Sequence, residues 1–122
     1  MTEPKPLKPE VIFAINDRIR WAGLATSRGK VIFSKMREGL KSLTPNSDDL
    51  LLLELRSQYI TEMTQQVSRW AGPASYVAVC FEKFTELTVI LKDKYVVLTI
   101  EKDVEAQEFA RIAESVRKLN SS

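Results

Sequence analysis

The chain has 122 residues, of which 44% are hydrophobic and 28% are charged, and its formal net charge is +2. This length and composition predict one folded domain rather than a disordered segment. No apolar stretch approaches the roughly 20 residues that cross a membrane. The N-terminus leads into no signal-type segment, so we expect a cytoplasmic protein.

Two absences restrict the chemistry. The sequence contains no histidine, which removes the commonest general base and the commonest transition-metal ligand. Its single cysteine, Cys80, excludes an internal disulfide, and a zinc site would need carboxylates alone. The four glycines begin no phosphate-binding loop. A histidine-free enzyme would have to use paired carboxylates, but the acids fall mostly on solvent-type helix positions, so we predict no enzymatic activity, metal or cofactor.

Basic residues concentrate in the first third of the chain. Residues 1–41 contain nine Lys or Arg against four acids, and residues 42–122 contain nine against twelve. One interpretation is a solvated sheet edge protected by charge. The other is a patch for an acidic protein, an anionic lipid surface or nucleic acid, formed by Arg20, Arg28, Lys30, Lys35 and Arg37. No aromatic residue alternates with these charges as in a base-stacking platform, which favours the first interpretation.

We expect residues 1–8 to form an extended leader rich in Pro and Lys, followed by one domain over 9–119 and a tail at 120–122. Pro9 suits the first position of a helix that ends near residues 16–17. Strands are expected at 20–26 and 30–35, joined by a turn at Gly29. Residues 36–46 have no clear period and are expected to form a loop.

A long helix should begin after Ser47, whose side chain can cap it, and end at Gly72-Pro73. At 100° per residue, its large apolar side chains from Leu52 to Trp70 fall within an arc of about 160°. This arc is expected to cover a sheet. Leu50 and Leu51 lie on the polar side of the helix instead, and Arg56 lies inside the apolar arc.

Arg56, in this helix, allows two interpretations, whereas Cys80, in a later strand, has one expected role. The methylenes of Arg56 can cover core atoms, or its guanidinium can pair with a carboxylate on another chain. Cys80 is expected to be a small buried side chain, because no neighbouring base marks it as reactive.

Three apolar runs, at 75–82, 86–91 and 95–100, predict strands. Their short links require antiparallel neighbours. Both pleat faces are apolar, so both should be covered. A last helix is expected over about 104–119, with Asp103 as its cap. The fold class is therefore α/β (α+β), with one five-stranded antiparallel sheet, the long helix on one face and the terminal helices on the other.

Over residues 10–119 this order resembles the roadblock family of dynein light chains, in the roadblock and longin superfamily, whose architecture is profilin-like. The resemblance rests on the hairpin Gly-Leu-Ala-Thr-Ser-Arg-Gly-Lys-Val-Ile at 23–32, the long second helix and the meander at 76–100. The segment at 36–39 also resembles archaeal proteins of this type. The resemblance implies a non-enzymatic scaffold that dimerises through its second helix and third strand and engages a small Ras-like GTPase.

The long helix carries more apolar surface than a surface helix of a small domain needs, which independently supports dimerisation. The expected interface consists of eight residues of the second helix and third strand: Leu50, Leu51, Leu55, Arg56, Tyr59, Tyr76, Ala78 and Cys80. We expect a homodimer. Two alternatives from other classes stay open, namely an anion- or nucleic-acid-binding protein that uses the basic hairpin, and a small-ligand sensor with a pocket between sheet and helix.

Overall fold

The computed structural model describes the backbone of residues 7–41 and 46–121, and the side chains of residues 7–41 and 53–119. The elements in chain order are α1 (Pro9–Phe13), β1 (Ile19–Thr26), β2 (Val31–Met36), α2 (Asn46–Ala71), β3 (Tyr76–Cys80), β4 (Phe84–Ile90), β5 (Lys94–Glu101) and α3 (Ala106–Ser121). All five strands join one antiparallel sheet in the order β2-β1-β5-β4-β3. The predicted order of elements and the predicted antiparallel sheet are confirmed.

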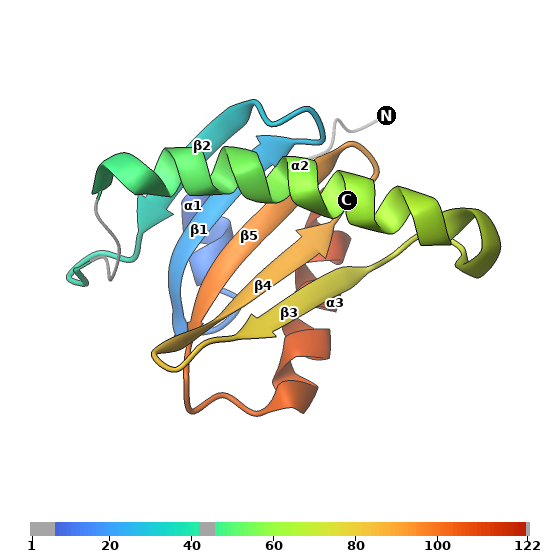
Figure 1. Cartoon of the computed structure of the whole chain (residues 1–122). Helices are drawn as coiled ribbons and strands as arrows, with labels where there is room; N and C mark the ends of the chain where they lie inside the picture. The colour runs from blue at the N-terminus through green and yellow to red at the C-terminus, as the bar shows by residue number, and fades with distance from the viewer. Residues whose placement is uncertain (1–6, 42–45, 122) are drawn as a thin grey trace, which may run out of the picture.

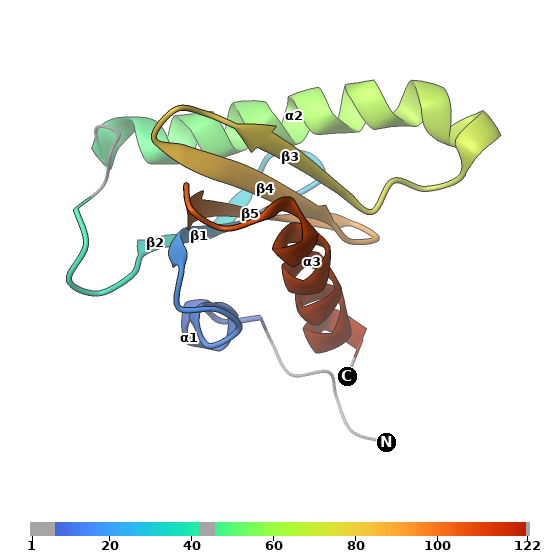
Figure 2. The same ribbon diagram turned by 90° about the horizontal axis from the view of Figure 1, so that it is seen from below.

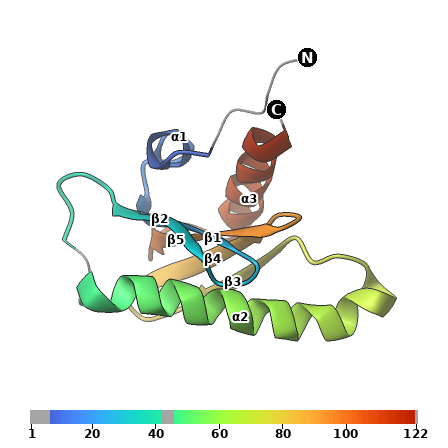
Figure 3. The ribbon, with the colours of Figure 1, turned by 90° about the horizontal axis from the view of Figure 1, so that it is seen from above.

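The helices cover the two faces of the sheet unequally. Helix α2 crosses one face, and α1 and α3 lie on the other (Figures 1, 2 and 3). This arrangement of layers is the one predicted. The larger core lies on the α1 and α3 side, where α3 contributes Phe109, Ile112, Ala113 and Val116. Among the described residues, the core beneath α2 is smaller and includes Trp21, Ala25, Leu53 and Val97, with Val31 and Met36 packed against it.

The hairpin of β1 and β2 turns at Gly29, as predicted. Gly29 has a φ of 91°, a conformation that costs glycine little and other residues more. Its N-H donates to the carbonyl of Thr26 at 2.9 Å, and the N-H of Thr26 donates to the carbonyl of Lys30 at 2.9 Å. The turn is also tied to α2, because the hydroxyl of Thr61 donates to the carbonyl of Ser27 at 3.2 Å.

The first helix is shorter than predicted. Helix α1 ends at Phe13, not near residues 16–17. The guanidinium of Arg37 donates to the carbonyl oxygens of Phe13 and Asn16 at 2.9 and 2.8 Å. The side chain of Asn16 in turn accepts the N-H of Arg18 at 2.8 Å. A side chain from the loop after β2 therefore satisfies carbonyls that a longer helix would have used.

Two further boundaries also differ. Helix α3 begins at Ala106, and Asp103, predicted to cap it, pairs instead with Arg18 on the loop before β1. Strand β4 begins at Phe84, two residues early, because the N-H of Phe81 donates to the carbonyl of Phe84 at 2.9 Å and closes a tighter turn. The partner of Asp103 is far away in sequence, and the partner of Phe81 lies on the other side of a turn.

Helix α2 and the sheet meet closely at Gly23 in β1. A Cβ atom added at Gly23 would lie 2.5 Å from Cη2 of Trp21 and 2.8 Å from Cδ2 of Leu53. Both neighbours belong to the core beneath α2. A side chain at position 23 would therefore push α2 away from the sheet or force Trp21 out of place.

We expect Gly23→Ala to lower the free energy of unfolding by about 1–3 kcal/mol, because it overpacks this contact. Urea unfolding followed by circular dichroism measures the change. The matched control is the same substitution in a Trp21→Phe background, where the two closest ring atoms are gone and the added cost should be smaller. Equal costs in both backgrounds would contradict this packing.

Candidate interaction surface

Helix α2 contacts the sheet through a narrow row of side chains. Leu53, Ser57 and Ile60 are buried, at one-turn spacing along the helix. The hydroxyl of Ser57 donates to the carbonyl of Leu53 at 2.9 Å, so this buried polar group is satisfied within the helix. The prediction that the whole apolar arc of α2 covers the sheet is therefore wrong.

The other large side chains of the arc that the structure describes are open to solvent. The exposed fractions of these side chains are 52% for Leu55, 60% for Tyr59, 39% for Met63, 55% for Val67 and 79% for Trp70. These positions recur every third or fourth residue, so they form one line along the helix. We call this line the α2 stripe. A sequence pattern identifies an apolar arc but does not show how much of its width the sheet can reach. The buried row and the exposed α2 stripe therefore belong to a single arc in the sequence.

The α2 stripe lies on the flank of the helix that faces β4 and β3. On the opposite flank, Thr61 contacts the β1–β2 turn. On the stripe's flank, Nε of Arg56 lies 2.6 Å from Oε1 of Glu86 in β4. Figure 1 shows β4 and β3 continuing beside α2 on this side of the sheet. The stripe therefore borders the edge of the sheet that ends in β3.

Strand β3 is an edge strand, and its register fixes the direction of its side chains. Tyr76 pairs with Val89 and Ala78 with Leu87. Directly paired residues share a face, and Val89 and Leu87 belong to the core on the α1 and α3 side. Tyr76, Ala78 and Cys80 therefore point to that face, whereas Val77 and Val79 point to the face that carries α2.

Cys80 is exposed, so the prediction of a buried cysteine is wrong. Tyr76 and Ala78, on the same face of β3, are exposed as well. A strand at the edge of a sheet has a neighbour on one side only, and its apolar pattern alone does not show this position. The expectation that both faces of every strand are covered fails here for the same reason.

The structure separates the predicted interface residues into two groups. Leu55, Arg56 and Tyr59 lie together on one flank of α2, while the three β3 residues lie on the far face of the sheet. The side chains of Leu50 and Leu51 fall outside the described residues. Val77 and Val79, which the sequence analysis did not single out, are the β3 side chains on the same face as α2.

Arg56 has its carboxylate partner within the chain. Its guanidinium contacts both carboxylate oxygens of Glu86, at 2.6 and 3.3 Å, and the side chains are 29% and 15% exposed. Burial raises the pKa of the Glu86 carboxyl, and Arg56 offsets only part of that rise. The interpretation of Arg56 as the partner of a carboxylate on another chain is not needed to explain its position in the apolar arc.

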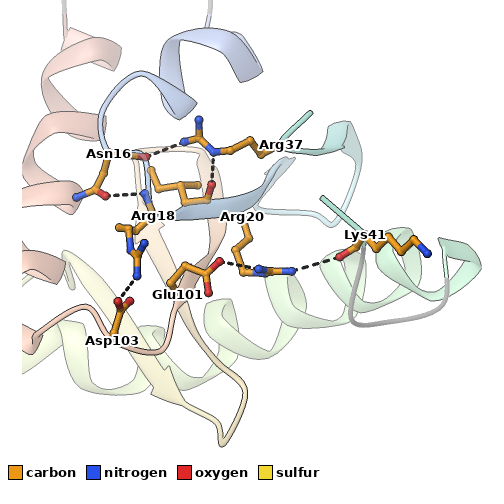
Figure 4. Close-up of polar contacts among 8 residues, drawn as sticks. Asn16, Arg18, Arg20, Arg37, Lys41, Glu101 and Asp103 are labelled. Carbon is orange, nitrogen blue, oxygen red and sulfur yellow. Dashed lines mark hydrogen bonds and ion pairs between the residues drawn. The ribbon is translucent and has the colours of Figure 1, made fainter. Parts of the chain in front are cut away.

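The basic hairpin does not present its charges as one patch (Figure 4). Arg20 pairs with Glu101 at 2.6 Å and donates to the carbonyl of Lys41 at 3.3 Å. Arg37 donates to the carbonyl of Ile19 at 2.7 Å and contacts the two carbonyls at the end of α1. These two arginines therefore hold the fold together.

The other three basic residues predicted to meet an anionic partner are exposed. Nζ of Lys35 lies 3.8 Å from the carboxylate of Glu10. Arg28 and Lys30 flank Gly29 at the tip of the hairpin. The anion-binding alternative thus rests on Arg28, Lys30 and Lys35 alone.

Within the described residues, no group of three or more Cys, Asp or Glu side chains is placed to hold a metal ion. In the same part of the chain, no helix is both long and apolar enough to cross a membrane.

No protein-family model matches the sequence, and neither does any curated protein sequence. The structure is similar to a roadblock/LC7 domain from Streptomyces avermitilis, with 13% identity over 94% of this chain and 98% of that chain and a TM-score of 0.66. MglB of Myxococcus xanthus gives 13% identity, coverage of 90% and 91%, and a TM-score of 0.66. MglB in a tetrameric arrangement gives 15% identity, coverage of 92% and 86%, and a TM-score of 0.62.

Profilin from Schizosaccharomyces pombe is also similar, with 14% identity, coverage of 89% and 90%, and a TM-score of 0.57. At these identities the comparisons concern the fold. The chain has the roadblock fold, as the resemblance in sequence predicted, and this fold shares its architecture with the profilins.

The Arg56–Glu86 pair gives a prediction for the pH dependence of stability. A carboxyl whose pKa is higher in the folded than in the unfolded chain binds protons more tightly when folded, so its contribution to stability falls as pH rises from the ordinary pKa through the raised one. The free energy of unfolding of the wild type should therefore fall relative to that of Glu86→Gln across this window. Urea unfolding of both proteins from about pH 4 to about pH 8 measures the difference.

Arg56→Gln serves as the second variant. Arg56 lowers the pKa of Glu86 through its charge and its hydrogen bond. Without it, the fall in stability should extend to higher pH. A difference between wild type and Glu86→Gln that does not change with pH would contradict the burial of this carboxylate.

Proposed function

We propose that this protein is a non-enzymatic interaction module that forms a homodimer through the α2 stripe and the neighbouring edge of β3. The observation that carries the proposal is the stripe itself, five large apolar side chains exposed in line on one helix. Single exposed apolar residues are common on protein surfaces. A contiguous row of them marks an interaction site.

The edge of β3 supports the same proposal. The outer backbone groups of an edge strand are available for pairing with another chain. Val77 and Val79 on the α2 face of β3 are only half-buried, so they extend the apolar surface from the helix toward the edge. A two-fold axis would place the same surface on both copies. Because the stripe itself carries no charge, two copies can meet there without opposing like charges.

The known structures support self-association, and the resemblance in sequence supports the choice of partner. MglB, a protein with this fold, occurs in a tetrameric arrangement, so self-association is compatible with the architecture. The resemblance to the roadblock family implies a small Ras-like GTPase as the partner of the dimer. This partner rests on analogy of fold, and the dimer rests on the exposed residues of this chain.

We expect Tyr59→Glu and Val67→Glu each to weaken the dimer at least tenfold, because each would bury an unpaired carboxylate in the interface. Sedimentation velocity over a concentration series measures the dissociation constant. Gln65→Glu is the matched control, since it adds the same charge on another side of α2 and should leave the dimer intact. A wild type that stays monomeric at tens of micromolar would rule out the dimer.

The partner is tested separately. Calorimetric titration of the dimer with a purified small Ras-like GTPase from the same organism, loaded with GDP or with a GTP analogue, should show saturable binding to at least one form. Binding to neither form would contradict this partner and leave the dimer unaffected.

A further inference from the structure

We draw no further inference here: the strongest candidate, the exposed surface patch that Tyr76, Ala78 and Cys80 of the edge strand β3 form on the α1 and α3 side of the sheet, carries nothing because nothing in the structure shows what covers it.

Discussion

The contact between α2 and the sheet is the constraint on which the rest of the molecule depends. It is narrow, because among the described side chains of α2 only the row of Leu53, Ser57 and Ile60 is buried. It is also close, because β1 carries a glycine where a Cβ atom would collide with Leu53 and Trp21. A helix held by so narrow a row leaves most of its circumference free. The proposed dimer surface uses the part of α2 that the sheet does not cover.

The two faces of the sheet carry cores of different size. The face beneath α1 and α3 holds the large apolar core, and burial of apolar area is the main favourable contribution to folding. The face beneath α2 holds a smaller core next to an ion pair of low exposure, Arg56–Glu86.

The sequence was informative about elements and layers because those follow from local periodicity. The turn at Gly29 and the end of α2 before Gly72 depend on glycine and proline, whose effects are local. The errors occurred where a distant residue decided the outcome. Arg37, in the loop after β2, ends α1 early, and Arg18 takes the carboxylate that was expected to cap α3.

The candidate surface was predicted only in part, for a related reason. The sequence showed that α2 has more apolar surface than a helix on a small sheet needs, and the stripe confirms it. It did not show that β3 is an edge strand, so Cys80 was expected to be buried and Val77 and Val79 were not distinguished from their neighbours. The position of a strand within a sheet depends on pairing between distant segments, which periodicity cannot reveal.

The uneven attachment of α2 also bears on its motion. Residues 53–61 are fixed by buried side chains and by the contact of Thr61 with the β1–β2 turn, whereas most side chains of residues 65–71 are exposed. For segments with few buried contacts, the free energy of local opening is lower than the free energy of global unfolding. The last turns of α2 should therefore open locally, and they carry Trp70 of the stripe. A second copy of the chain bound at the stripe would order these turns, so dimerisation would be thermodynamically coupled to the closing of the end of α2.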